Sequence, residues 1–348
     1  MNPVVGSVGS KVITRDTALL FYVLREPGPL PEYLHKMLGS ARDSIVKRLV
    51  LDGVLELERE DGTFVHGAAA MVELGSGNRK PVNSPRDYLS TLSLQAIEYG
   101  AKLEEDEPGV LADHLYRFNR LPLTAKWERV LPDSKAVSCW LGSEAGTLLG
   151  RKLERAYVRS ESPSWYHCRG RTSRLRSGFS HKLYISPRPE ALPQVFAFVA
   201  DACLSHEVRA FKVGCNLSSV LRPDKLVLYF EGEEPLHRIA EKLRMTLKDV
   251  ESHGVPFTAT IDPAGLLSWG MDPPGWQAVS DQNRHSWRLF IVDRIAIALV
   301  SAQRNSEVSS PVNFALERIR LEGIDPQSWT APKTLWTGEG REILKSLK

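Results

Sequence analysis

The chain has 348 residues, 42% of them hydrophobic, which is enough apolar content to bury a sizeable core in two or three domains. Its formal net charge of +3 excludes the strongly basic composition of a general nucleic-acid binder. The cysteines form no CxxC pair and have no zinc-finger spacing with histidine, so we expect reduced thiols and no metal. They are Cys139, Cys168, Cys203 and Cys215.

The N-terminal sequence, MNPVVGSVGSKVITRD, lacks the charged start, apolar stretch and cleavage site of a secretory signal. No apolar run in the sequence approaches the roughly 18 residues that are needed to span a bilayer. We therefore expect a cytoplasmic protein with no membrane partner.

Residues 14–67 carry the pattern of three helices followed by a β-hairpin around a strong Asp-Gly turn signal. The expected elements are helices at 17–24, at 30–38 and after the N-cap Ser40, and strands at 54–58 and 63–66. This order is typical of a winged helix-turn-helix. We therefore expect residues 1–75 to form a winged-helix-like recognition domain.

The role of that domain stays open between recognition of DNA, recognition of a peptide, and a helical dock for the rest of the chain. The third helix mixes basic and acidic side chains, namely Arg42, Lys47, Arg48, Asp43 and Asp52. That balance is poor for a helix lying against phosphates, so the sequence disfavours nucleic acid as a partner.

Residues 76–165 are expected to form a mostly helical linking region, which begins within a polar stretch at 75–90. Further along, the segment RGRTSRLRSGFSHK carries five basic residues between Arg169 and Lys182. Such a segment is either a mobile cationic loop or a channel that attracts an anionic substrate, and the residues leave both alternatives open.

Residues 166–348 have the pattern of an α+β domain with an antiparallel sheet and flanking helices. The expected strands are 181–186, 208–214, 225–230, 255–261 and 265–269, and the expected helices are 190–204, 234–250 and 285–303. Within the helix at 234–250, the apolar side chains recur at core spacing, which indicates packing rather than function.

Three of these strands place cations among residues that favour burial. The residues concerned are Lys182 and Tyr184 in HKLYIS, Lys212 in AFKVG, and Arg222, Lys225 and Tyr229 in RPDKLVLYF. Because side chains alternate along a strand, Lys182 and Tyr184 share one face, while Lys212 points away from its two apolar neighbours. One lysine in a strand usually lies on a solvated face, but several strands that each present cations indicate a site.

Cations crowded on one face disfavour one another's charge, so one lysine can be neutral near pH 7 and act as a general base. The remaining cations, Lys225 and above all the forked guanidinium of Arg222, suit a phosphate dianion. A base beside a phosphate clamp fits elimination better than hydrolysis, which usually needs an activated water, a nucleophile or a metal.

The segments HKLYIS, AFKVG, LRPDKLVLYF and GLLSWGMDPP, over roughly residues 180–300, resemble the phosphothreonine lyases among bacterial type III effectors. They resemble still more the related lyase component of class V lanthipeptide synthetases. The resemblance implies a phosphothreonine-lyase-like fold that works without a cofactor. It also implies β-elimination of phosphate from phosphoserine or phosphothreonine in a precursor peptide, which gives dehydroalanine or dehydrobutyrine.

The resemblance assigns roles to individual residues. It implies that Lys212 removes the α-proton and that Lys182 and Arg222 bind the phosphate, while Tyr229 matches a tyrosine at the end of the next strand. Tyr184 departs from the family pattern, because the effector enzymes have a histidine there that donates a proton to the departing phosphate. Either nearby cations lower the pKa of the Tyr184 phenol so that it serves as this acid, or Tyr184 only hydrogen-bonds the phosphate and another group protonates it. We expect the first, because Lys182 should share its face and lower that pKa.

Two further contacts are implied near the C-terminal helix. A second phosphate-binding arginine is expected there, and among Arg284, Arg288 and Arg294 the preferred candidate is Arg288. Asp272, in the turn GMDPPGW, either contacts the substrate backbone or caps the turn, and capping is favoured.

The implied partners are a phosphorylated precursor peptide, whose leader the N-terminal domain would hold, and a separate peptide kinase, because kinase motifs are missing from this sequence. The resemblance leaves room for a cyclase subunit. Two alternatives stay open. One is a catalytically inactive scaffold subunit of the same complex, and the other is a winged-helix DNA-binding regulator that senses a phosphorylated ligand.

Overall fold

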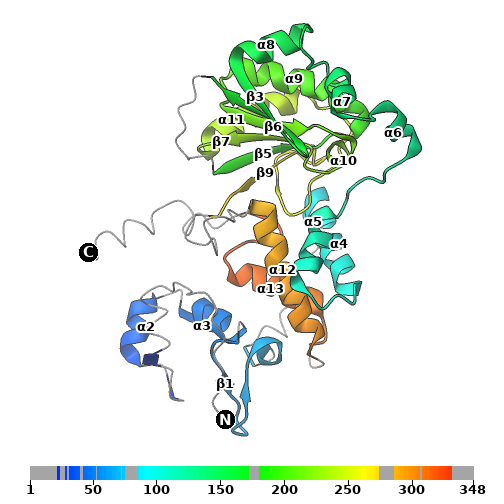
Figure 1. The fold of residues 1–348 in the computed structure, drawn as a ribbon. Helices are drawn as coiled ribbons and strands as arrows, with labels where there is room; N and C mark the ends of the chain where they lie inside the picture. Colours follow the sequence, from blue (N-terminus) through cyan, green and yellow to red (C-terminus); the bar gives the residue numbers. More distant parts are fainter. Residues whose placement is uncertain are drawn as a thin grey trace.

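The computed structural model describes the chain at residues 22–23, 28–29, 31–39, 42–51, 53–71, 73–74, 85–171, 180–273, 286–305 and 308–330 (Figure 1). Over these residues the chain forms a seven-stranded antiparallel sheet, a group of helices next to it, and a small N-terminal unit. The predicted class, helices with an antiparallel sheet, is confirmed. No helix in the described ranges is long and apolar enough to cross a membrane.

The sheet has the strand order β3-β4-β6-β7-β5-β9-β8, and each neighbouring pair is antiparallel. Its strands are β3 (Tyr157–Ser162), β4 (Trp165–Gly170), β5 (His181–Ile185), β6 (Ala210–Gly214), β7 (Leu226–Phe230), β8 (Ala259–Thr260) and β9 (Leu267–Met271). The expected strands 181–186, 208–214, 225–230 and 265–269 are confirmed as β5, β6, β7 and β9.

Two parts of the sheet differ from the prediction. The sheet already begins with β3 at Tyr157, within the region that was expected to be a mostly helical linker. The expected strand 255–261 is reduced to β8, because Phe257 has φ 63° and this left-handed backbone interrupts a β-ladder.

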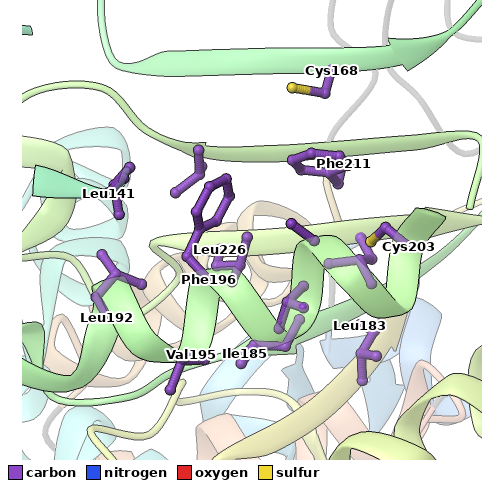
Figure 2. Packing of buried hydrophobic residues seen from close by; sticks show 14 of the residues in the cluster. Leu141, Cys168, Leu183, Ile185, Leu192, Val195, Phe196, Cys203, Phe211 and Leu226 are labelled. Atoms are coloured by element: carbon purple, nitrogen blue, oxygen red, sulfur yellow. The ribbon is translucent and has the colours of Figure 1, made fainter. Parts of the chain in front are cut away.

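One face of the sheet packs against α9 (Leu192–Ser205) and α11 (Glu233–Thr246). Figure 2 shows Phe196 of α9 near Phe211 and Leu226 of the sheet, and each buried Phe or Leu side chain contributes roughly 1.5–3 kcal/mol. The smaller helices of this unit are α6 (Ala125–Val130), α7 (Ser134–Trp140), α8 (Leu148–Ala156), η3 (Pro189–Ala191) and α10 (Leu217–Val220). Because this core takes alternate strand residues, the residues between them lie on the opposite face.

A second apolar core joins α4 (Tyr88–Lys102), α5 (Pro108–Arg117), α12 (Trp287–Gln303) and α13 (Pro311–Leu321). At the first turn of α12, Trp287 packs directly on β9, where a Cβ at Gly270 would collide with the indole ring. Gly270 pairs with Lys182 across the sheet, so this contact lies on the face opposite α9 and α11. The N-terminal end of α12 therefore packs on the sheet face on which the cations were predicted.

The N-terminal unit has a small core of its own, made of Leu34, Leu49, Val50, Leu55, Val65 and Ala70. Its elements are α2 (Glu32–Leu38), α3 (Arg42–Leu51), β1 (Leu57–Glu58), β2 (Phe64–Val65) and η2 (Gly67–Met71). The two strands pair antiparallel, as the turn signal predicted. The expected first helix, 17–24, lies mostly outside the described residues, so the winged helix stays a prediction.

Candidate active site

The predicted cationic face forms on three adjacent strands of the sheet. Lys212 of β6 is the direct neighbour of Val227 on β7, and Val227 in turn neighbours Tyr184 on β5. Lys182 and Tyr229 face each other in the same way, two pairs further along. Directly opposed residues of antiparallel strands point to the same side, so these side chains share the face opposite the α9 core.

Lys212 is half-buried, and its ammonium lies 3.9 Å from the ring centroid of Trp165 on β4. Among the residues that the structure describes, it has no hydrogen-bond or ion-pair partner. Burial lowers the pKa of Lys212 to about 8, and the positive charges of Lys182 and Arg222 act in the same direction. An amine with this pKa is partly neutral near pH 7 and available as a base.

Arg222 forms a two-point contact with Asp224, with Nε 2.8 Å from Oδ1 and Nη2 2.9 Å from Oδ2. Tyr116 of α5 donates its hydroxyl to Oδ2 of Asp224 at 3.3 Å and accepts from Nη2 of Arg222 at 3.2 Å. Burial alone would raise the pKa of Asp224, but the guanidinium groups of Arg288 and Arg222 outweigh it and hold that pKa well below its usual range. The carboxylate therefore stays charged and fixes the Arg222 fork.

Arg288 is 1% exposed, which differs from its predicted role as a second phosphate-binding arginine. It donates from Nε to the Pro256 carbonyl at 3.2 Å and from Nη2 to the Tyr116 carbonyl at 2.9 Å. Its Nη1 lies 3.0 Å from Oδ2 of Asp224, without hydrogen-bond geometry. All three nitrogens of its guanidinium lie against protein oxygens, so it supports Asp224 from behind and offers no donor to a ligand.

The other two arginine candidates do not replace it. Arg294 stacks over Phe290, with Cζ 3.4 Å from the ring centroid, and its Nε lies 3.7 Å from Glu322 of the α13 end. Arg284 falls outside the described residues. Among the arginine candidates that lie in the described ranges, Arg222 is the one at the cationic face.

Lys182 pairs with both carboxylate oxygens of Asp272, at 2.6 and 2.7 Å. Oδ1 of Asp272 also accepts from the backbone N–H of Trp287 at 2.8 Å, so this carboxylate lies at the start of α12. A negative charge at a helix N-terminus is stabilising. Asp272 thus holds Lys182 and caps the start of α12, a role that differs from the predicted capping of the turn at 270–276, part of which lies outside the described residues.

Tyr184 is 3% exposed and lies against Val227 and Val255. Burial raises the pKa of its phenol well above the ordinary value, and Asp272 adds to this effect. The expectation that Lys182 would lower this pKa is wrong, because the Lys182 charge is paired with Asp272 and desolvation dominates. Burial likewise raises the pKa of Tyr229.

Lys225 was predicted to contact the phosphate, but it is fully buried. Its Nζ donates to the Pro187 carbonyl at 2.8 Å and lies 2.7 Å from Nδ1 of His253. Nε2 of His253 donates in turn to the Asn119 carbonyl at 2.6 Å. Burial lowers the pKa of Lys225 to about 7 and that of His253 to about 3. Pro187 and His253 therefore enclose the ammonium of Lys225, and it does not reach a ligand.

Four side chains of the site were missed by the sequence reasoning: Trp165, His167, Tyr116 and Asp224. His167 is the cross-strand neighbour of Lys212 and is joined to Ser162 at 3.1 Å through Nε2, and burial lowers its pKa. The only local signal was Asp224, two residues after Arg222. The others reach the site through strand pairing and helix packing, which local patterns do not reveal.

The arrangement brings a base and a surplus of positive charge together. Three cations, Lys182, Arg222 and Arg288, face two carboxylates, Asp224 and Asp272, so the group carries a net charge of +1 when Lys212 is neutral. A buried net charge is unfavourable without a counterion. The site can therefore bind an anion within reach of a neutral amine.

No protein-family model and no curated protein matches this sequence. Among solved structures, the chain is similar to an effector protein from Pseudomonas syringae pv. tomato, with 14% identity, 70% of this chain and 98% of the other covered, and a TM-score of 0.42. It is similar to the type III effector and phosphothreonine lyase OspF from Shigella flexneri, with 10% identity, coverage of 36% and 77%, and a TM-score of 0.30. A mutant of the Salmonella plasmid virulence C protein has 14% identity, coverage of 59% and 97%, and a TM-score of 0.31.

Proposed function

We propose that this protein is a phosphoamino-acid lyase, which removes phosphate from phosphoserine or phosphothreonine in a peptide by β-elimination. One observation carries the proposal. The half-buried amine of Lys212, with its pKa lowered to about 8, shares a sheet face with a cation cluster that carries a surplus of positive charge. The amine can take a carbon-bound proton while the cations bind a phosphate on the next carbon.

The proposed reaction begins when the neutral amine of Lys212 takes the α-proton. The electron pair of the Cα–H bond forms the Cα=Cβ double bond, and the Cβ–O bond breaks with its electrons on the departing phosphate. Arg222 and Lys182 stabilise the charge that develops on that oxygen. The products are dehydroalanine or dehydrobutyrine, inorganic phosphate, and a protonated Lys212 that returns its proton to solvent.

The phenol of Tyr184 has a narrower part in this scheme than a histidine would have. Because burial raises its pKa, Tyr184 keeps its proton and donates a hydrogen bond more readily than it transfers a proton. We place it beside the phosphate oxygen as a hydrogen-bond donor. Protonation of the phosphate then falls to solvent or to another group of the site.

The setting we propose is modification of a ribosomal precursor peptide of the lanthipeptide type. The substrate would be a leader-bearing peptide that a separate kinase has phosphorylated, and ring closure would fall to a cyclase subunit. The motifs that resemble class V lyase components support this setting. The N-terminal unit, with its β1–β2 hairpin, is the part we propose to hold the leader.

The test is mass spectrometry of a phosphothreonine peptide and a phosphoserine peptide after incubation with the purified protein. Loss of phosphoric acid marks elimination, whereas loss of HPO3 marks hydrolysis and would contradict the proposal. Lys212→Ala should abolish the loss while phosphopeptide binding survives within about tenfold, or about 1.4 kcal/mol. Lys242→Ala, on the exposed side of α11, is the matched lysine control and should keep full activity.

One observation favours a second candidate, a phosphopeptide-binding subunit without turnover. The acid position of the related enzymes holds Tyr184, whose raised pKa makes it a poor proton donor. This candidate predicts that the protein binds phosphorylated peptide tightly and that the mass of the peptide does not change at any pH. The same incubation, combined with a binding titration, separates the two functions.

A further inference from the structure

Cationic and aromatic side chains alternate in one continuous column at the site. Trp165 has the ammonium of Lys212 3.9 Å from its ring centroid and Cζ of Arg222 at 5.0 Å. Tyr116 has Cζ of Arg222 5.4 Å from its centroid and Cζ of Arg288 at 4.6 Å. The column thus runs Lys212, Trp165, Arg222, Tyr116, Arg288, and its members come from five separate segments of the chain.

The alternation of rings and cations reduces the repulsion between the positive charges. Like charges at close range disfavour one another, and the negative face of an aromatic ring attracts a cation within about 6 Å of its centroid. Asp224 compensates the two arginines directly, with contacts of 2.8 Å to Arg222 and 3.0 Å to Arg288. Lys212 has no such carboxylate contact in the part of the chain that is described. Among the described residues, its neighbour is the indole ring of Trp165.

We infer that Trp165 is the positioning residue of the base: its ring holds the Lys212 amino group next to Arg222, so that one substrate residue meets both. This rests on the proposed lyase function and deepens it. The ring sets the distance between the amine that takes the α-proton and the guanidinium that binds the phosphate. A phosphorylated serine or threonine places these two groups on adjacent carbons, so that distance decides whether the residue is productively bound.

The position of Trp165 in the sheet supports this role. It is two residues from His167 on β4, and His167 is the direct cross-strand neighbour of Lys212, so both point to the cationic face. The charged groups that act on Lys212 are Lys182, Arg222, Asp224 and Asp272, with His167 alongside. Replacing the indole alters none of these five side chains, and although Arg222 loses its contact with the ring, its two contacts with Asp224 remain, so the effect of Trp165 on Lys212 can be tested by mutation.

The experiment compares Trp165→Leu, which keeps an apolar cover over the amine, with Trp165→Phe, which keeps a ring. Lys212 is followed by the Cε shift of labelled lysine in NMR, assigned with Lys212→Arg, and the same proteins are assayed for elimination across pH. Because a ring favours the charged amine, Trp165→Leu should lower the pKa of Lys212 by about one pH unit. It should lower kcat more than tenfold at pH 9, with a smaller effect on KM. Trp165→Phe should retain most of both properties.

Trp127 provides the control, because it pairs edge-to-face with Trp140 at 5.9 Å, away from this column. Trp127→Leu should leave the Lys212 titration unchanged. An unaltered Lys212 titration in Trp165→Leu would overturn the inference, as would equal behaviour of the Leu and Phe variants. If wild-type protein eliminated no phosphate, the proposed function would fall, and the NMR titration would still decide whether the ring holds the ammonium.

Discussion

Arg222 and Asp224, two residues apart in the sequence, form a two-point ion pair. Nε of Arg222 lies 2.8 Å from Oδ1 of Asp224, and Nη2 lies 2.9 Å from Oδ2. The aspartate is buried, and Arg288 approaches the same carboxylate at 3.0 Å. One carboxylate thus orients two arginines but neutralises only one of their two positive charges. The fork of Arg222 is fixed before any ligand arrives, which reduces the entropy that phosphate binding would otherwise cost.

Asp224→Asn should destabilise the protein strongly, because it leaves the partly buried guanidinium of Arg222 and the fully buried guanidinium of Arg288 without their carboxylate. Removing one partner from a buried ion pair costs about 3–5 kcal/mol, which chemical denaturation can measure. Asp113→Asn is the control, since its pair with Arg117 at 2.9 Å is exposed and contributes about 0–1 kcal/mol. Phosphate should restore part of the stability of Asp224→Asn by replacing the lost anion. Equal effects of the two changes would contradict the proposed cluster.

Arg222→Lys should weaken binding of a phosphorylated peptide far more than binding of its unphosphorylated form. Lysine keeps the charge, but its single ammonium cannot hold Asp224 as Nε and Nη2 of Arg222 do and at the same time offer phosphate the donors of Nη1. Fluorescence anisotropy with both peptides measures the difference. If both affinities fell by the same factor, Arg222 would act on the fold or on the peptide backbone instead.

The pH dependence of elimination should show a limb near pH 8. The base works only when neutral, so kcat/KM should rise as pH increases through the pKa of Lys212, at about 8, and level off above it. Lys212→Arg should be inactive at every pH, because a guanidinium does not lose its proton in this range. A profile that falls across this interval would rule out Lys212 as the base.

Tyr184→Phe should lose no more than about tenfold in rate, the size of one neutral hydrogen bond of about 0.5–1.5 kcal/mol. The reason is the raised pKa of the buried phenol, which makes it a donor and not an acid. Steady-state kinetics with the phosphothreonine peptide measures the change. A loss of 10²- to 10⁴-fold would instead identify Tyr184 as the general acid.

Lys225 should make the stability of the protein depend on pH. Its pKa is about 7 when folded and about 10.4 in an unfolded chain, so between these values the unfolded state binds more protons. Stability should therefore rise with pH over this window, and the free energy of unfolding of wild type relative to Lys225→Met should increase from pH 7 to pH 10. Denaturant titrations of both proteins measure this difference. A difference that stays constant with pH would show that the pKa of Lys225 is not lowered in the folded protein.

The sequence alone determined which side chains of each strand lie opposite its apolar residues, because alternation along a strand is a local property. The apolar residues of each strand assign the opposite face to Lys182 and Tyr184, to Lys212 and to Tyr229. The pairing of β5 with β7 and of β7 with β6 then brings these faces together. The α9 and α11 core takes the other face for the same reason. Period-two patterns need no knowledge of the partner strand.

Only the tertiary structure decided what surrounds that face. Trp165 and Tyr116 reach the cations through the pairing of β4 with β6 and the packing of α5, which connect residues far apart in sequence. Burial reversed two expectations, since it raises the pKa of Tyr184 and places Lys225 in the interior beside His253. Desolvation depends on everything that packs around a group, so no local sequence pattern specifies it.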